Sequence, residues 1–358
     1  MNLGERIKAA RIRARLSQRA LARQLGISAM AVCKYERGEI RPHPNVLNRM
    51  AEILKVDTDF FFRSPSVRVV QMLFSEEETI SQAMESELRV YLEEELGRWL
   101  ELEQLRKTRP SPRFPSPKRF PIRTEEGAEE TAVALRRAWD LGMDPIHSVV
   151  GVLEDQGVRV IEWEYSVPAG WGVLDNGEIV LGIQRGADSL TVRWEVARLV
   201  GGWFAIETTD PLKARVRERF ARSFLVPQEV AQRELEQGGE DLSPEEFMIL
   251  QDKYGLRADQ WIIRAMELGK IDQEKVRELM RAVQRLRQEN PTREFSFLER
   301  PQRARRLGCL PSQGADRKRK RPFSSPAGSS LPSNASPSSS QPAGWMHTPV
   351  GEEGMFLD

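Results

Sequence analysis

The chain has 358 residues, of which 40% are hydrophobic and 30% charged, and its formal net charge is +1. This length allows about two compact domains plus flexible segments. The sequence contains no apolar run of about 20 residues and no signal-peptide pattern, which excludes a membrane-spanning helix and a secretory signal. We therefore expect a cytoplasmic protein without a membrane partner.

The charge and the cysteines are unevenly placed along the chain. Residues 1–63 carry 13 Lys and Arg against 6 Asp and Glu, whereas residues 64–108 carry 5 against 10. Concentrated basic charge predicts a nucleic-acid partner for the N-terminal part. Cys33 and Cys309 are too few and too far apart in sequence for a disulfide framework or a zinc ribbon, which favours a reducing compartment.

Residues 17–38 have the pattern of a helix-turn-helix. Two amphipathic segments flank the turn, with apolar positions at Leu21, Ala22 and Leu25 and then at Val32 and Tyr35. Gly26 supplies the positive φ of a tight turn, and Ser17 and Ser28 are N-cap residues. In such a motif the second helix, here about 28–37, enters the major groove of DNA. Double-stranded operator DNA is therefore the expected partner.

Further helices are expected on both sides of this motif. The first covers about 3–16 with its basic residues, including Arg6 and Arg11, pointing outward, and a later one covers 45–56. The stretches LSQRALARQLGIS, KYERGEIRP and AEILKVDTDFFF resemble the Xre family of Cro/repressor-like DNA-binding domains. The resemblance covers residues 3–62.

The resemblance implies which side chains meet DNA. It places Gln18 at a phosphate, Ser28, Ala29, Met30 and Lys34 at base edges, and Arg41 at the backbone or minor groove. A lysine can donate to guanine acceptors, and small apolar side chains can contact a thymine methyl group. We also expect Arg11 to contact phosphate. The alternatives are an ordinary solvated basic face and, for Ala29 and Met30, packing inside the domain.

Residues 64–123 are expected to connect two domains. A helix over 75–107 has an apolar stripe at Ile80, Met84, Leu88, Leu92, Leu96 and Trp99. Strict heptads fail at Glu95 and Arg98, so we predict that the stripe packs on the next domain rather than forming a coiled coil. The Pro-rich basic stretch 109–121 cannot be a helix or a central strand and is predicted as a linker at a domain boundary.

A second domain is expected over 124–290. Its predicted elements are helices over 126–141 and 146–156, strands over 158–164, 169–174 and 178–183, and an apolar helix over 189–206. The predicted fold class is mainly α with a small β-sheet: an all-α helix-turn-helix domain, an α+β second domain and a disordered tail.

The order of these elements resembles the ImmA/IrrE family of zinc metallopeptidase-like proteins. The stretches PIHSVVGVLEDQGVRV, AGWGVLDNGEIVLGI, LTVRWEVARLVGGWF, ERFARSFLVP and LQDKYGLRADQWIIRAMELGKI occur in family order over about 140–272. The resemblance implies a zincin-like fold whose metal site lies on the helix over 189–206.

The zinc chemistry of that family is absent from this sequence. In the H-E-x-x-H motif two histidines hold zinc and the glutamate polarises its water. The matching positions here are Trp194, Glu195 and Arg198; an indole offers no lone pair and a guanidinium repels the metal. The third ligand of the family falls near Ala214 or Val216, and the nearest acid is Glu218.

None of the three histidines, His43, His147 and His347, stands at a ligand position. We therefore predict no metal, no cofactor and no catalytic residue, with Glu195 as a relic. The simplest interpretation of Glu195 and Arg198 is an i, i+3 ion pair. The alternative is a pocket in which Trp194, Arg198 and Trp203 bind a ligand.

Four helices are expected near the end of the second domain, at 228–237, at 247–254 and 257–268 on either side of a corner at Gly255, and at 272–289; residues 243–246 are an N-cap and first turn. Globular patterning stops at Pro291. Residues 291–358 are predicted as a disordered tail, basic over 300–322 and Ser/Pro-rich over 324–344, or as the product of a shifted reading frame. The basic run could add nonspecific DNA affinity or act as a nuclear signal.

The sequence predicts a homodimeric DNA-binding transcriptional regulator with a pseudo-peptidase domain that senses or binds a small-molecule or protein ligand. One alternative is a site-specific metalloendopeptidase that cleaves a repressor. The other is an antitoxin-like interaction module that binds DNA only in a complex.

Overall fold

The structure is a computed structural model and describes residues 3–62, 67–74, 80–106, 114–205, 208, 212–238, 242–289, 297 and 299–301. Residues 1–311 form one compact unit. Apart from 300–301, the predicted basic and Ser/Pro-rich tail lies outside the described residues, as do Cys309 and His347.

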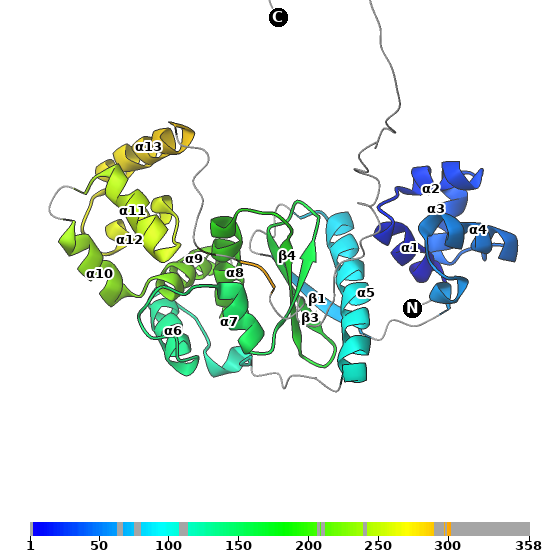
Figure 1. Cartoon of the computed structure of the whole chain (residues 1–358), viewed down its shortest axis with the longest axis horizontal. Helices are drawn as coiled ribbons and strands as arrows, with labels where there is room; N and C mark the ends of the chain where they lie inside the picture. Colours follow the sequence, from blue (N-terminus) through cyan, green and yellow to red (C-terminus); the bar gives the residue numbers. More distant parts are fainter. Residues whose placement is uncertain are drawn as a thin grey trace, which may run out of the picture. The chain divides into compact units, whose positions relative to one another are not determined.

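The described chain is mainly helical with one four-stranded sheet, which confirms the predicted fold class (Figure 1). Its helices are α1 (Leu3–Arg13), α2 (Gln18–Leu25), α3 (Ala29–Arg37), α4 (Pro44–Leu54), α5 (Gln82–Arg106), α6 (Glu125–Ala138), α7 (Val149–Asp155), α8 (Ser189–Phe204), α9 (Leu212–Leu225), α10 (Gln228–Gln237), α11 (Pro244–Tyr254), α12 (Ala258–Glu267) and α13 (Gln273–Glu289). Its strands are β1 (Val69–Phe74), β2 (Arg159–Trp163), β3 (Ala169–Leu174) and β4 (Ile179–Gln184). Two 3₁₀ turns cover Thr58–Phe61 and Pro117–Arg119.

Helices α1 to α4 enclose a small core, and the predicted caps and turn are all present. The Ser17 hydroxyl accepts the Ala20 N–H, and Gly26 ends α2 with φ 69°. Ser28 caps α3 in the same way, at the Ala31 N–H. These local signals fix the turn between α2 and α3, because each cap satisfies backbone groups that the helix end leaves unpaired.

The sheet has the order β1-β3-β4-β2, with β2 parallel to β4 and the other pairs antiparallel. Strands β2, β3 and β4 match the predicted strands closely. Strand β1 lies in the segment predicted only as a connection, and it adds the sheet edge beside β3. Trp163 lies over Gly182, where a Cβ would stand 1.8 Å from the indole.

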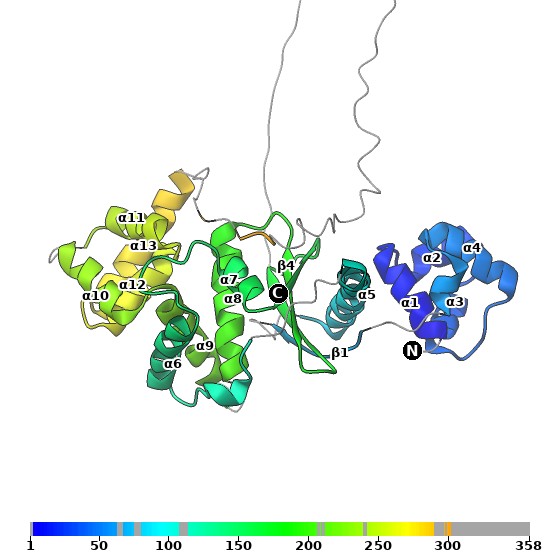
Figure 2. The ribbon, with the colours of Figure 1, turned by 60° about the horizontal axis from the view of Figure 1, so that its bottom comes forward.

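Helices cover both faces of the sheet (Figures 1 and 2). The stripe of α5, including Leu88, Leu92, Leu96 and Trp99, packs with β1 and Trp163 in one cluster. The apolar helix α8 packs with Trp171 and Leu181 on the other face. The prediction that the stripe packs on the second domain is confirmed. The apolar stripe of α5 is therefore buried by packing within the chain.

The described part of the Pro-rich stretch, residues 114–121, packs against the core, where the sequence predicted a linker. Phe114 lies among the rings of Trp139, Trp171, Trp203 and Phe204, with centroids 5.3 to 6.3 Å away. The Trp203 Nε1–H donates to the Pro115 carbonyl at 3.0 Å. Proline prevents regular structure here but not burial, because side chains and carbonyls remain free to dock.

Helices α10 to α13 follow the predicted order, and α11 begins with a capping box between Ser243 and Glu246. Packing then continues beyond the predicted end of the domain at Pro291, since Phe297 is 6% and Glu299 5% exposed. Part of the segment that was predicted as a tail is therefore packed. No described helix is long and apolar enough to cross a membrane.

Candidate nucleic-acid interface and degenerate zinc motif

Helix α3 has one packed face and one exposed face. Val32 and Glu36 are buried, and Ala29 packs partly against the core of α1 to α4. Met30 is 63% exposed, Ser28 and Arg41 are exposed, and Lys34 is half-buried. A base-reading helix needs such an exposed face at its N-terminal half. The structure thus places Met30 and Lys34 away from the core, whereas it gives Ala29 a packing role.

Arg11 does not point outward, which corrects the expectation from the helix pattern. Its Nε and Nη2 donate to the two carboxylate oxygens of Glu36 at 2.5 and 3.0 Å, and its Nη1 donates to the Leu16 carbonyl at 2.8 Å. The Gln18 amide also donates to Glu36, at 2.8 Å. Arg11 is 8% exposed, so its guanidinium holds α1, α3 and the α1–α2 connection together. It is not available to a phosphate.

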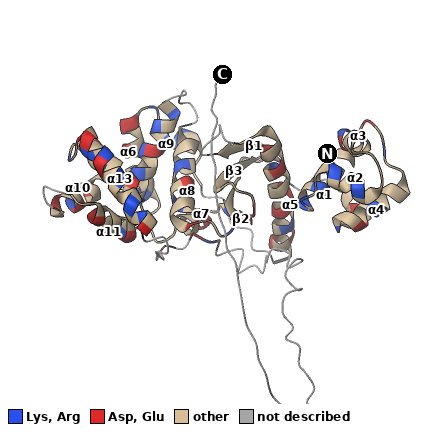
Figure 3. Cartoon of the chain, turned by 90° about the horizontal axis from the view of Figure 1, so that it is seen from above, with Lys and Arg blue, Asp and Glu red and all other residues tan. Residues whose placement is uncertain are grey.

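Arg6 is the second exception to the predicted outward orientation. It is 4% exposed, donates to the Phe60 carbonyl at 3.0 Å, and pairs with Glu94 of α5. A small apolar cluster of Ala9, Ile12 and Val90 lies beside this pair. Figure 3 shows acidic residues along α5 and basic residues on α1 and α2. The part of α1 around Arg6, which the sequence pattern predicts to face solvent, is therefore in contact with α5.

The degenerate zinc motif is buried in α8. Trp194, Glu195 and Arg198 are 7%, 9% and 7% exposed. Arg198 Nη1 lies 3.3 Å from each carboxylate oxygen of Glu195. The predicted i, i+3 ion pair is thus present, but inside the protein rather than on its surface. With an indole and a guanidinium in the ligand positions, these side chains do not fit a zinc ion.

The remaining ligand candidates do not assemble around this motif. Val216 is fully buried, and Glu218 lies 3.5 Å from Arg222 across one turn of α9. Among the described residues, no three His, Cys, Asp or Glu side chains gather as a metal site would require. Trp203, the third residue of the predicted ligand pocket, donates its indole N–H to the Pro115 carbonyl. A ligand at Trp194 and Arg198 stays a prediction.

Two comparisons with known proteins give matches to the N-terminal part of the chain. Residues 2–59 match the model of a helix-turn-helix domain family. The chain is 38% identical over 61 residues to a protein of Rhodospirillum rubrum described as an uncharacterized transcriptional regulator in the ATPase CF(0) region. That match covers 17% of this chain and 56% of the relative, so the chain spans about half the length of the relative. No solved structure matches the chain.

Proposed function

We propose that the protein is a sequence-specific DNA-binding transcriptional regulator that acts as a homodimer on operator DNA. The observation that carries this proposal is helix α3, capped by Ser28 and presenting Met30 and Lys34 on its exposed face. The helix-turn-helix family match and the description of the relative support it. The resemblance to Xre domains further proposes Ser28, Met30 and Lys34 as base-reading residues.

The test is selection of bound sequences from a random double-stranded library, followed by affinity measurements with the full chain. We expect one enriched, two-fold symmetric sequence, because a homodimer reads two equivalent half-sites. Affinity for it should fall steeply as salt rises, because phosphate contacts release counterions. Absence of any enriched sequence, with binding equal on all duplexes, contradicts the proposal.

A matched pair of variants locates the base-reading surface. Lys34→Ala removes one positive charge from α3, and Arg277→Ala removes one from an exposed position on α13. We expect Lys34→Ala to lower the ratio of operator to random-DNA affinity about 10-fold, the cost of one base contact. Arg277→Ala should leave the ratio unchanged. If the two variants had the same ratio of operator to random-DNA affinity, Lys34 would not be part of the base-reading surface.

We further propose that the second domain is a pseudo-peptidase that has kept the fold of a zinc enzyme and binds a ligand or partner instead. The replacement of both imidazoles by Trp194 and Arg198, and the Glu195–Arg198 ion pair, support this. Elemental mass spectrometry of the purified chain after mild dialysis tests it, with no zinc expected. About one zinc per chain would overturn the ligand argument and favour the metalloendopeptidase.

A further inference from the structure

We propose that the backbone amides at the start of α7, Arg193 of α8 and the α11–α12 corner form a recognition site for a peptide with a Phe-x-Glu sequence. Phe297 and Glu299 of the same chain occupy this site. In trans, the ligand would be a peptide that carries the same pair of side chains. The DNA-binding function proposed above does not depend on this site.

The Glu299 carboxylate is held by four hydrogen bonds. One oxygen accepts the Val149 N–H at 3.0 Å and Arg193 Nη1 at 2.9 Å. The other accepts the Val150 N–H at 2.9 Å and the Ser148 hydroxyl at 3.1 Å. Ser148 in turn accepts the Gly151 N–H at 3.0 Å, which fixes its position. An ionised carboxylate has about four acceptor positions, and this arrangement fills them all.

Arg193 makes the site specific for an anion. Both side chains of the Arg193–Glu299 pair are 0% exposed. The Arg193 guanidinium is anchored on the domain by the carbonyls of Ile146 and Tyr254. Burial lowers the pKa of Arg193 and the charge of Glu299 opposes that effect. A buried cation needs a partner charge, so Arg193 needs a carboxylate beside it.

Phe297 supplies the second part of the recognition. Its ring lies against the Arg193 guanidinium, 4.5 Å from carbon to centroid, and the residue is 6% exposed. Gly255 makes room for both, since a Cβ there would stand 2.7 Å from Arg193 Nε and 3.0 Å from Phe297. The Phe297 ring and the Glu299 carboxylate, two residues apart, thus both contact the guanidinium of Arg193.

Phe297 and Glu299 are held through their side chains. Among the described residues, no backbone–backbone hydrogen bond joins 297–301 to the rest of the chain. Among the described residues of the segment, the attachment consists of the Glu299 hydrogen bonds and the burial of Phe297 and Pro301. A second peptide with this pair would meet the same donors, so it would compete with the segment of the chain. Its binding would release residues 297–301 from the domain.

The test compares two single variants of the full chain by hydrogen–deuterium exchange. Glu299→Ala removes the carboxylate, and Arg300→Ala alters an exposed neighbour in the same segment. We expect the Val149 and Val150 amides to exchange about 10- to 100-fold faster in Glu299→Ala, because each loses a charged acceptor. Arg300→Ala should exchange as the unmodified protein does. Unchanged exchange in Glu299→Ala overturns the proposal.

Rescue in trans separates a peptide site from a purely structural contact. A synthetic peptide of residues 293–305, added to the Glu299→Ala protein, should restore protection of both amides. The same peptide carrying Glu299→Ala should bind to that protein at least about 10-fold more weakly. Equal binding of the two peptides, or no binding of either, overturns the site. If Glu299→Ala does not fold, Phe297→Ala, which keeps the Arg193–Glu299 pair, takes its place in the same rescue experiment.

Discussion

Arg11 and Glu36 show how one residue pair can change the interpretation of a surface. They are 25 positions apart, and their side chains meet in two hydrogen bonds below the exposed face of α3. A basic residue on an amphipathic helix normally points to solvent, which is why the sequence pattern predicts Arg11 at a phosphate. Its buried partner lies on another helix, and no local spacing reveals that contact.

We expect Arg11→Ala to act through folding rather than through direct DNA contact. Removal of Arg11 leaves the Glu36 carboxylate buried without its cation, which should destabilise the helix-turn-helix domain by about 3–5 kcal/mol. Circular dichroism with urea gives the loss of stability, and DNA titration at low temperature gives binding by the folded fraction. Arg13→Ala is the control because Arg13 is exposed on the same helix. If Arg11→Ala were as stable as the unmodified chain but bound DNA weakly, Arg11 would be shown to contact a DNA phosphate directly.

The same limit applies to the other buried arginines. Arg136, Arg193 and Arg264 are 0 to 2% exposed, and each has at least one acceptor that is far away in sequence. Composition and periodicity predicted the capping serines and the turn glycine because those act within a few residues. They also predicted the Glu195–Arg198 pair, one helical turn apart. They did not predict Glu299, whose partner is 106 positions away.

At the scale of elements, helices and strands with local signals were predicted well, and those defined by their partners were not. Helix α11 has its capping box, and β3 and β4 have a turn at Asn176-Gly177 between them. Strand β1 has a β-branched, apolar sequence from Val67 to Phe74 that signals a strand, yet it precedes a long helix and was assigned to the connection. Its identity as a strand depends on pairing with β3, about 100 residues later.

The close packing of Trp163 on β4 leads to a prediction for Gly182, with Gly127 of α6 as a comparison. Gly182→Ala would place a methyl group 1.8 Å from the indole of Trp163, so we expect a loss of about 3 kcal/mol in unfolding free energy. Gly127→Ala in α6 meets only the Thr124 hydroxyl, at 3.4 Å, and should stabilise by up to about 1 kcal/mol because glycine is costly in a helix.

Urea unfolding of both variants measures the two effects. The opposite signs separate a steric clash from the general effect of adding a methyl group. If Gly182→Ala were as stable as the unmodified chain, Trp163 would have to move aside freely, and the described contact between β2 and β4 would not constrain the sheet.

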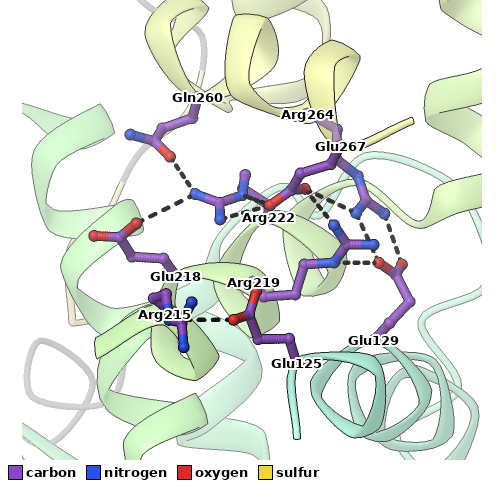
Figure 4. A network of polar contacts seen from close by, with 9 residues as sticks. All are labelled: Glu125, Glu129, Arg215, Glu218, Arg219, Arg222, Gln260, Arg264 and Glu267. Carbon is purple, nitrogen blue, oxygen red and sulfur yellow. Dashed lines mark hydrogen bonds and ion pairs between the residues drawn. The ribbon is translucent and has the colours of Figure 1, made fainter. Parts of the chain in front are cut away.

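At the scale of the whole molecule, charged side chains join helices from distant parts of the second domain (Figure 4). Arg264 of α12 holds both oxygens of Glu129 of α6, at 2.6 and 2.7 Å. Arg219 of α9 bridges Glu129 and Glu267 of α12, at 3.1 and 2.8 Å. Arg264 is 0% exposed, and its partner Glu129 is 13% exposed, so the centre of this network is largely shielded from solvent and joins α6, α9 and α12.

The network predicts a pH dependence of stability. Burial raises the pKa of Glu129, but the hydrogen bonds and charge of Arg264, with the charge of Arg219, outweigh it and lower the pKa below the ordinary 4.5. A lowered pKa in the folded state contributes stability that is present above the unfolded pKa and lost as the pH falls through the folded one. Glu129→Gln should therefore cost on the order of 3 kcal/mol at neutral pH and progressively less below the ordinary pKa.

Urea unfolding of the unmodified chain and of Glu129→Gln, at a series of pH values from neutral to about 3, measures this difference. Glu130→Gln is the control, since Glu130 is an exposed neighbour on the same helix. A stability difference that stayed constant at every pH would show that the variant acts through packing and not through the charge of Glu129.

The position of strand β1 decides where this protein can exchange parts with others. Phe62 closes the helix-turn-helix domain and Val67 already packs in the cluster under α5, so four residues separate them. A gene fusion joined within these four residues would transfer the DNA-binding part and leave the sheet intact. A fusion joined at residue 80 would carry β1 away and expose the backbone of β3, which invites aggregation between sheet edges. Recombination that gives this core a new operator specificity is therefore restricted to that short junction.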